Sequence, residues 1–257
     1  MSQQVPAVSM RRFNKRKEDS EVLPLIQAVM KDRPSYGYKR ITAMVNKRFG
    51  RKYNRKRVYR LMRKEGLLLP RHPARRDEHG GTGKVMVPKS NTRWCSDCFE
   101  IHCWNDERVH VAFAMDCCDR EVIHFIASKE DILSDGIQQL MLEAVERRFR
   151  RPRTPRPVQW LSDRGSIYKS KHTQEFATSI GLKPCFTAAY SPASNGMAEA
   201  LVASFKRDYV YVNDCETADW VLAQLPTWFG DYNEVAPHSA LAMRSPREFR
   251  RGRQLAG

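Results

Sequence analysis

The chain contains no long apolar stretch, and this absence excludes several classes of protein. No run of about 20 apolar residues is present, so a transmembrane helix is not expected. No secretory signal peptide is recognisable, and the seven cysteines lack the even number and regular spacing of a disulfide framework. Internal repeats and a heptad seam are also missing. Together these absences predict a globular protein that works in the reducing cytoplasm, without a membrane partner.

Acidic residues are scarce in the first third of the chain. Residues 1–92 hold 24 Lys and Arg against 7 Asp and Glu, whereas residues 93–257 hold 21 against 22. The formal net charge of +16 is therefore concentrated at one end of the sequence. Such concentration is typical of proteins that bind a polyanion such as nucleic acid. A merely soluble basic surface is the alternative, and the clustering of the charge argues against it.

Composition and hydrophobic periodicity divide the chain into five segments. Residues 1–20 are polar and basic and are expected to be disordered. Residues 21–68 predict three short helices with a tight turn before the last, which is typical of a helix-turn-helix domain. Residues 69–92 are rich in proline and glycine and indicate a linker. A large α/β domain is predicted over residues 93–250, followed by a short tail at 251–257.

The third predicted helix, residues 55–65, is strongly basic. Asn54 is suited to cap its start, and Gly66 to end it. Its cations either contact DNA in a major groove or along phosphates, or form a solvated surface; DNA contact is the favoured interpretation. The candidate DNA-binding residues of this helix are Arg55, Lys56, Arg57, Arg60, Arg63 and Lys64.

From residue 93 onward, the pattern predicts alternating strands and helices. The first three strands are expected to form a meander of hairpins. A basic, proline-rich loop is expected at residues 150–157. The predicted elements are strands at 93–102, 108–116 and 121–127, a helix at 133–149, a strand at 158–162, a helix at 172–181, a strand at 184–187, and helices at 195–213 and 217–232. This order resembles an RNase H-like fold.

Three carboxylates of the α/β part lie in distinctive segments. Asp97 lies at the start of a predicted strand, and Asp163, 66 positions later, ends another. Glu199 follows after 36 more positions, just inside a predicted helix. Carboxylates on two strands and a helix can converge on a pair of divalent cations, and their hard oxygen atoms suit Mg²⁺ or Mn²⁺. Two such ions activate an attacking oxygen and stabilise a leaving one in phosphoryl transfer.

Several short segments match those of a known protein family. They are Ser35-Tyr-Gly-Tyr-Lys-Arg, Lys56-Arg-Val-Tyr-Arg-Leu-Met-Arg, Arg93-Trp-Cys-Ser-Asp, Ala114-Met-Asp-Cys-Cys-Asp-Arg-Glu, Leu161-Ser-Asp, Ser191-Pro-Ala-Ser-Asn-Gly-Met-Ala-Glu, Phe205-Lys-Arg-Asp-Tyr, His238-Ser-Ala-Leu and Ser245-Pro-Arg-Glu. From about residue 34 to residue 250, the chain resembles the larger-frame transposase of bacterial insertion sequences. It is most similar to the insertion sequence 3 family, insertion sequence 2 subgroup.

This resemblance implies an α/β, RNase H-like catalytic core of the retroviral-integrase type, preceded by a small all-α helix-turn-helix domain. It implies that Asp97, Asp163 and Glu199 are both catalytic residues and ligands of two Mg²⁺ ions, for which Mn²⁺ can substitute. The expected activity is metal-dependent DNA cleavage and strand transfer. The expected partners are element ends and target DNA, other copies of the chain on DNA, and an upstream-frame transposase subunit.

Three further residues near the carboxylates are candidates for DNA contact. Lys206 lies seven positions after Glu199, on the same helix face, where the resembling enzymes place a basic residue against the donor DNA end. Asn195 would open this helix near a phosphate. Arg164 stands where the family more usually has Asn, and it either contacts phosphate or points to solvent.

Other acidic residues are expected to have different roles. Glu100 should face the opposite side of the strand from Asp97. Asp116 and Asp119 are expected to accept hydrogen bonds from turn amides. Asp208 should lie roughly 180° around the helix from the candidate glutamate.

Cys95 and Cys98 form a Cys-x-x-Cys pair, for which zinc binding is one interpretation. Strand alternation would send the two thiols to opposite faces of the sheet, so small apolar core residues are the favoured interpretation. Two other functions stay open for the whole chain. They are an RNase H-like nuclease, which would share the three carboxylates, and a non-catalytic DNA-binding regulator, which would use only residues 1–92.

Overall fold

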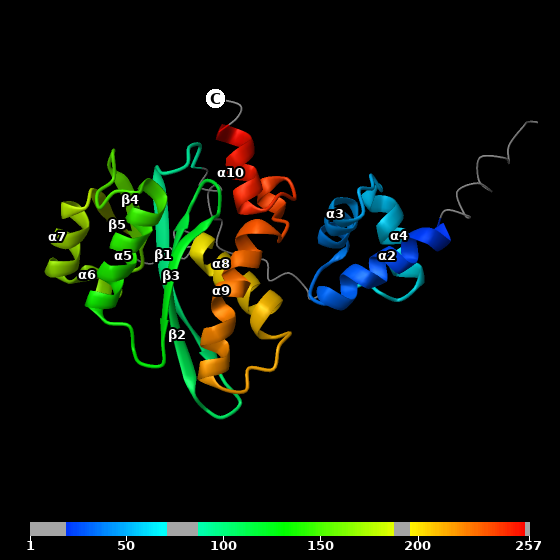
Figure 1. The fold of residues 1–257 in the computed structure, drawn as a ribbon, viewed down its shortest axis with the longest axis horizontal. Coiled ribbons are helices and arrows are strands. Elements are labelled where there is room, and N and C mark those ends of the chain that lie inside the picture. The colour runs from blue at the N-terminus through cyan, green and yellow to red at the C-terminus, as the bar shows by residue number, and fades with distance from the viewer. Residues whose placement is uncertain (1–18, 71–86, 188–195, 255–257) are drawn as a thin grey trace, which may run out of the picture. The chain divides into compact units, whose positions relative to one another are not determined.

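The computed structural model describes residues 19–70, 87–187 and 196–254 of the chain. The chain divides into two compact units, Met1–Ala74 and Arg75–Gly257, which are called here the amino-terminal unit and the core unit (Figure 1). The expected disordered tail, apart from its last two residues, and most of the expected linker lie outside the described residues. Among the described residues, no helix combines the length and the apolar character needed to cross a bilayer.

The amino-terminal unit consists of three helices around a small apolar core. The helices are α2 (Asp19–Asp32), α3 (Tyr38–Arg48) and α4 (Arg55–Lys64). Each helix buries one apolar stripe, formed in α4 by Val58, Leu61 and Met62. Asn54 caps α4, because its side-chain oxygen accepts a hydrogen bond from the amide of Lys56 at 2.9 Å. The three helices expected from periodicity are therefore confirmed.

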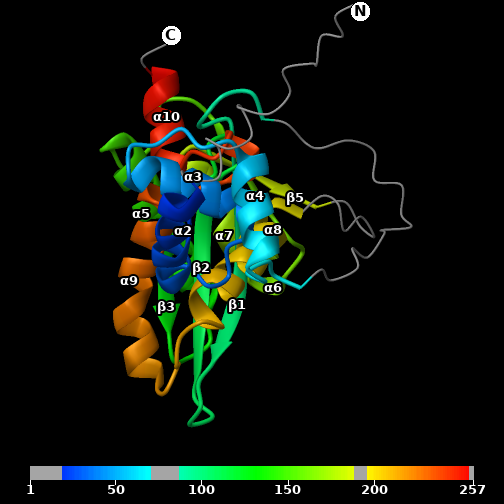
Figure 2. The same ribbon diagram turned by 90° about the vertical axis from the view of Figure 1, so that its right-hand side faces the viewer.

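The core unit is built on a five-stranded mixed sheet. Its strands are β1 (Arg93–His102), β2 (Arg108–Asp116), β3 (Val122–Ser128), β4 (Val158–Ser162) and β5 (Leu182–Phe186). Their order is β3-β2-β1-β4-β5, and the first three can be followed side by side in Figure 2. The predicted meander is confirmed, because β1 pairs with β2 and β2 with β3 in antiparallel fashion. Strand β4 then pairs in parallel with both β1 and β5.

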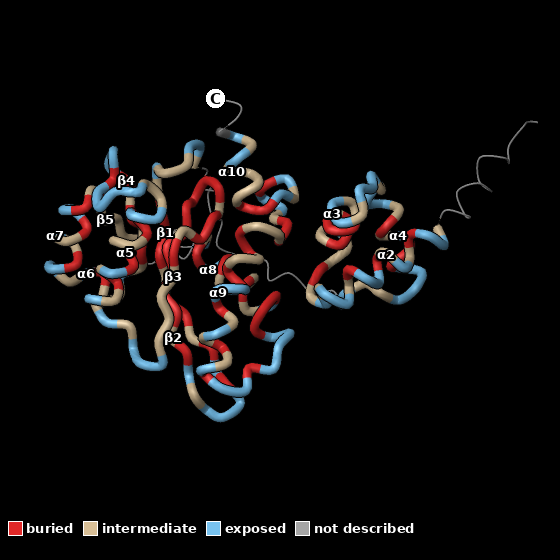
Figure 3. The backbone as a smooth tube through the Cα atoms, in the orientation of Figure 1, coloured by how far each residue is buried: buried red, intermediate tan, exposed pale blue. Residues whose placement is uncertain are grey.

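Helices cover both faces of this sheet (Figure 1). The helical elements are α5 (Ser134–Phe149), α6 (Ser166–Lys169), α7 (Lys171–Ser179), α8 (Gly196–Phe205), the π-helix η2 (Lys206–Val210), α9 (Ala218–Glu234), the 3-10 helix η3 (Ser239–Leu241) and α10 (Pro246–Gln254). One apolar cluster joins α5, α6 and α7 to one face, through Trp94 and Ala114. The other joins α8, η2 and α9 to the opposite face, through Cys95, Phe99 and Phe113. Because successive strand side chains alternate between faces, β1 contributes to both clusters, and half of its ten residues are buried (Figure 3).

Three helical segments differ from the sequence prediction. The expected helix at residues 195–213 is divided into α8 and η2, whose wider turn buries Asp208, Tyr209 and Val210 in succession. The short helix α6 was not predicted, because four residues are too few to show periodicity. Helix α10 was not predicted because arginines dominate its sequence, and it extends to Gln254, inside the expected tail.

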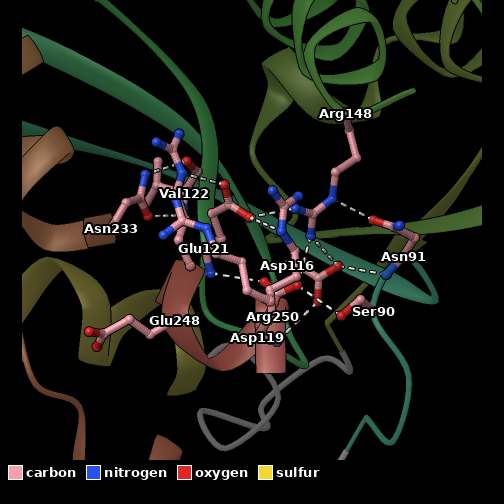
Figure 4. A network of polar contacts seen from close by, with 12 residues as sticks. Ser90, Asn91, Asp116, Asp119, Glu121, Val122, Arg148, Asn233, Glu248 and Arg250 are labelled. Carbon is pink, nitrogen blue, oxygen red and sulfur yellow. Dashed lines mark hydrogen bonds and ion pairs between the residues drawn. The ribbon is translucent and has the colours of Figure 1, made fainter. Parts of the chain in front are cut away.

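A buried ionic network ties α5 to the turn between β2 and β3. The guanidinium of Arg148 in α5 contacts Asp116 at 3.1 Å, Asp119 at 2.8 Å and Glu121 at 2.5 Å (Figure 4). All four side chains are almost completely buried, and Arg148 also donates to the side-chain oxygen of Asn91 at 2.6 Å. Because isolated buried charges are costly, each of these carboxylates depends on the cation beside it.

Helix α10 extends this network from the carboxyl-terminal side. Arg247 donates to Glu121 at 2.8 Å and to Glu234 of α9 at 2.6 Å. Arg250 lies 3.1 Å from Glu121. The basic helix α10 is therefore held by electrostatic contacts with the acidic β2–β3 turn and the end of α9.

The carboxylates of this network do not share the same protonation tendency. Burial raises the pKa of Asp119 to about 6, because the favourable charge of Arg148 only partly offsets the loss of water around it. Burial also disfavours the charged form of Glu121, but the charges of Arg148, Arg247 and Arg250 outweigh it and lower the pKa of that carboxyl below its ordinary value. One buried site therefore contains a carboxyl group with a raised pKa, Asp119, beside a carboxyl group with a lowered pKa, Glu121.

Candidate active site

Asp97 lies on β1 and Asp163 directly follows the neighbouring parallel strand β4, at the same level of the strand register. Arg93, Trp94 and Cys95 pair with the residues 66 positions later in β4. The same offset separates Asp97 from Asp163, which directly follows the last residue of β4. Neighbouring strands lie about 4.8 Å apart, so a register continued by two residues sets the two carboxylates side by side.

The backbone after β4 shapes the position of Asp163. Its Oδ1 accepts a hydrogen bond from the amide of Gly165 at 2.9 Å. A Cβ atom at Gly165 would lie only 3.1 Å from the same oxygen, so a larger residue there would require the Asp163 carboxylate to shift by a few tenths of an ångström. The buried Ser162 donates its hydroxyl to the carbonyl oxygen of Asp163 at 3.2 Å. Arg164 is exposed, and its Nε donates to the carbonyl oxygen of Thr187 at 3.2 Å, a contact that the sequence interpretation did not include.

Tyr168 connects the segment after Asp163 to the strand that carries Asp97. Its hydroxyl lies 2.9 Å from the Ser96 hydroxyl and 3.5 Å from the Cys98 sulfur, so it contacts both neighbours of Asp97. Burial raises the pKa of Tyr168 well above its ordinary value, so the phenol stays protonated. Sequence reasoning missed this residue, because its contacts join positions that lie 72 and 70 apart in the chain.

The negative charges of Asp97 and Asp163 both act on the thiol of Cys98. Cys98 is exposed as a whole residue, but its sulfur is turned inward to Tyr168. Burial of the thiol, together with the negative charges of Asp97 and Asp163, raises its pKa to about 11, despite the hydrogen bond from Tyr168. This shared influence is consistent with two carboxylates at one place.

Zinc binding by Cys95 and Cys98 is not supported by the structure. Cys95 packs in the apolar cluster beneath α8 and α9, whereas Cys98 contacts Tyr168 on the opposite face. The two thiols therefore diverge, as strand alternation predicts. The interpretation as buried core residues is right for Cys95, which is buried, and wrong for Cys98, which is exposed.

Glu199 lies on α8, which packs on the same face of β1 as Asp97. Ala198, its neighbour in α8, is buried in the cluster that contains Cys95 and Phe99, while Glu199 itself is exposed. Among the residues that the structure describes, no group of three His, Cys, Asp or Glu side chains is close enough to hold one ion. The strand register thus brings Asp97 and Asp163 to the same level, but the structure does not gather Glu199 into a common ligand sphere with them.

Lys206 lies close to the carboxylate-bearing face of β1. Its ammonium is 5.8 Å from the centre of the Phe99 ring, and Phe99 lies two residues from Asp97 on the same face. Lys206 is also the first residue of η2, so the change of helix type begins there. Asn195, the other candidate at the start of this helix, lies outside the described residues.

The competing acids occupy the places expected for structural roles. Asp116 Oδ1 accepts the amide of Cys118 at 2.7 Å, and Asp119 Oδ1 accepts that of Glu121 at 3.0 Å. The prediction that both serve turn amides is confirmed, but their shared contact with the buried arginine of α5 was not foreseen. Asp208 is buried and forms two hydrogen bonds with Arg207.

Glu100 lies one strand residue beyond Phe99 and is directed away from the Asp97 face. Its carboxylate is 3.6 Å from Arg108 and 3.8 Å from His110, which lie on β2. This placement agrees with the strand alternation expected from the sequence.

The candidate DNA-binding residues of α4 divide into two groups. Arg57 and Arg60 both pair with Asp19 at the start of α2, the former at 2.9 Å. Lys64 lies 3.3 Å from Glu65. Three cations are exposed and form no ion pair with any described residue, namely Arg55, Lys56 and Arg63. Sequence periodicity could not reveal the contacts with Asp19, because they join residues about 40 positions apart.

Comparison with family models separates the same two parts of the chain. Residues 17–75 match an HTH-like domain. Residues 87–192 match an integrase core domain, and residues 180–246 match a second model of that description. These matches confirm the fold class expected from the sequence, an integrase-type α/β core after a helix-turn-helix domain.

Individual relatives extend the similarity over almost the whole chain. Transposase InsD for insertion element IS2A/D/F/H/I/K of Escherichia coli is 43% identical over 251 residues, which are 96% of this chain and 83% of that protein. Transposase InsD for insertion element IS2-9 of Escherichia coli strain K12 is also 43% identical, over 96% of this chain and 82% of that protein. Among solved structures, a chain of the simian T-cell lymphotropic virus intasome has a TM-score of 0.51 at 17% identity, over 64% of this chain and 55% of that chain. The likeness to the intasome chain is one of fold alone.

Proposed function

Because the chain belongs to the insertion-element transposases of the IS3 family, IS2 subgroup, we propose that it cleaves and joins DNA strands through Asp97, Asp163 and Glu199. The observation that supports this proposal is the register of β1 against β4, which pairs residues 66 positions apart, the same offset that separates Asp97 from Asp163. Glu199 completes the triad from α8 on the same face, and its carboxylate must approach the sheet to do so.

The donor set fits divalent cations of the magnesium type. Asp97 and Asp163 offer hard, anionic oxygens, and two neighbouring carboxylates repel each other unless a positive charge lies between them. When bound, two Mg²⁺ ions would neutralise the charge that develops on the attacking and leaving oxygens. Tyr168 keeps the two carboxylate-bearing segments at a fixed separation, because it contacts residues on both sides of Asp97.

The proposed reaction has two successive phosphoryl transfers. Water attacks a phosphodiester at an element end and leaves a free 3′-hydroxyl group. That hydroxyl then attacks a second phosphodiester in the target and displaces its 3′ oxygen. The protein positions the reacting groups in line and stabilises charge, so no covalent protein intermediate is required.

DNA is the proposed partner of both units. The exposed cations of α4 would hold duplex DNA in the amino-terminal unit, and Lys206 would contact the donor end near Phe99. Two ends must be joined to one target, so we propose that several copies assemble on DNA, together with an upstream-frame subunit where the element encodes one.

A combined cleavage and joining assay tests this function. The full-length protein would be incubated with Mg²⁺ and a duplex carrying the inverted repeat that flanks its reading frame. We expect nicking at the repeat end, followed by covalent joining to a second DNA. Nicking without joining would indicate a nuclease instead, and binding without either reaction would indicate a regulator.

Neutralising the exposed cations of α4 should weaken DNA binding in a salt-dependent manner. The variant combines Arg55→Gln, Lys56→Gln and Arg63→Gln. Each lost phosphate contact should reduce the slope of log affinity against log salt concentration by about 0.9, because fewer counterions are released. Fluorescence anisotropy of labelled duplex at several salt concentrations measures this slope.

The matched control removes three exposed cations from α2 and α3 of the same unit, namely Lys31, Lys39 and Lys47. An equal loss of slope in both variants would contradict a specific role for α4, since it would show a general effect of net charge.

Lys206→Ala should slow strand joining about ten- to a hundredfold at subsaturating DNA, because a charge-assisted phosphate contact is worth roughly 1.5–3 kcal/mol. The dependence of the remaining rate on Mg²⁺ concentration should match that of the parent protein, because the carboxylates are intact. Single-turnover joining kinetics measure both quantities. Lys171→Ala on α7 is the control. A normal joining rate for Lys206→Ala would show that Lys206 makes no contact with DNA that matters for joining.

A further inference from the structure

A second basic feature lies in the core unit, far from α4 in the sequence. The segment 150–157 connects α5 to β4 and has the sequence Arg-Arg-Pro-Arg-Thr-Pro-Arg-Pro; it is called here the arginine loop. Four of its side chains are exposed arginines, namely Arg150, Arg151, Arg153 and Arg156. None of the four forms an ion pair with a residue that the structure describes, and the loop contains no acid.

The arginine loop is held in place by its own central residue. Thr154 is buried; its amide donates to the carbonyl oxygen of Ile180 at 3.0 Å, and its hydroxyl donates to that of Gly181 at 2.9 Å. Gly181 has a φ of +85°, and a Cβ atom there would lie 2.3 Å from the Thr154 hydroxyl. Three prolines further restrict the backbone. The four cations are therefore displayed from a fixed loop, which lowers the entropy lost when they bind a ligand.

The composition of the arginine loop matches phosphate recognition better than a solvated surface. Residues 93–257 carry 21 basic and 22 acidic residues, so this unpaired cluster is not the result of a generally basic unit. A solvated face would be served equally well by lysine, yet all four cations are arginines. The planar guanidinium donates two parallel hydrogen bonds to a phosphate group and is less strongly hydrated than an ammonium. The exposed Lys183 of β5 lies one residue past the Leu182 that pairs with Val158, at the same end of the sheet.

The arginine loop stands at a defined distance from the paired aspartates. It immediately precedes β4, and Asp163 immediately follows that strand. Five strand residues rise by about 3.3 Å each, so the loop and Asp163 are separated by roughly 15–20 Å along the strand. Phosphates of one DNA strand are spaced about 3.4 Å apart along the helix axis, so this distance corresponds to about five base pairs.

We propose that the arginine loop binds the phosphate backbone of duplex DNA about five base pairs from the bond that lies at Asp97 and Asp163. The distance of about five base pairs from the reacting bond rests on the proposed function, whereas the contact between the arginine loop and DNA does not. The loop would orient a duplex along β4 and so deliver a phosphodiester to the two carboxylates.

The test compares two full-length variants of equal charge. In the loop variant, Arg151, Arg153 and Arg156 are each changed to Gln, while Arg150 is kept because its backbone ends α5 in the left-handed conformation. The control variant removes three exposed cations elsewhere in the core unit, through Arg108→Gln, Lys129→Gln and Lys171→Gln. Binding of a duplex of arbitrary sequence is measured between about 50 and 200 mM salt, without a divalent cation.

In the loop variant, the slope of log affinity against log salt concentration should decrease by about 0.9 for each arginine that contacts a phosphate. Its affinity at the lower salt concentration should fall roughly ten- to a hundredfold. The control should keep the parent slope. A second loop variant with lysine at the same three positions should restore the slope, because it restores the charge. The proposal is overturned if the Gln variant binds like the control, or if the Lys variant fails to recover the slope. Neither outcome depends on cleavage, so failure of the proposed catalytic triad would be recognised separately.

Discussion

Asp97→Asn, Asp163→Asn and Glu199→Gln are each expected to abolish strand cleavage and strand joining. Each change removes one negative charge from a set that must neutralise divalent cations, while the size of the side chain is kept. Loss of several kcal/mol of transition-state stabilisation lowers the rate by roughly a thousandfold or more. Gel assays of nicking and joining in Mg²⁺ measure the effect.

Two comparisons make this prediction specific. DNA affinity should stay near that of the parent protein, because the cations assigned to binding are untouched. Glu100→Gln on the same strand should retain activity, since Glu100 faces Arg108 and His110 on the other side of the sheet. If any one of the three variants cleaves at a near-normal rate, that residue is not a ligand and the triad is assigned wrongly.

Arg148→Met is expected to destabilise the core unit by about 3–5 kcal/mol, because it leaves buried carboxylates without their cation. Asp116 and Asp119 are the most affected, since Glu121 keeps the contacts with Arg247 and Arg250. For a unit of this size, the melting temperature should fall by roughly 6–20 °C. Thermal unfolding followed by circular dichroism measures the change.

The neighbouring Arg147→Met on the same helix provides the control, because Arg147 is exposed and outside the network. Its melting temperature should change by little. A similar melting temperature for Arg148→Met and the parent would show that the buried network contributes no net stability.

The effect of Arg148→Met should also depend on pH. In the parent protein, Asp119 has a folded-state pKa of about 6, above its ordinary value. Its contribution therefore favours the folded state at low pH and is lost as the pH rises through about 6. Glu121 has a lowered pKa, so its contribution is present at higher pH and is lost on acidification. Removing Arg148 raises the cost of charged Asp116 and Asp119, so the destabilisation should be largest above pH 6 and should shrink below it.

The amino-acid sequence was informative wherever a property is local or periodic. The strands at 93–102, 108–116 and 158–162 were predicted with the bounds that the structure shows, because each is a short apolar run bounded by turn or loop residues. The cap of α4 by Asn54 was predicted because it joins residues two positions apart. The 66-residue spacing of the two aspartates was visible in the sequence, but only the parallel pairing of β1 with β4 gave it a spatial meaning.

Other features depend on contacts between distant residues, and periodicity does not report them. The pairing of Arg57 with Asp19 joins two helices, and it removes one predicted DNA-binding cation from the exposed set. The contact of Tyr168 with Ser96 spans 72 positions, so nothing near either residue indicates it.

The sequence by itself determined the two-part organisation, the helix-turn-helix and α/β classes, and the residues proposed for catalysis, because charge, periodicity and short motifs are read along the chain. Only the tertiary structure decided which charges are paired. Arg148 and Arg151 are both arginines near the end of α5, yet the first is buried among three carboxylates and the second is exposed on the arginine loop. The physical reason is that the energy of a charge is set by its surroundings, and these come from strands and helices brought together by folding.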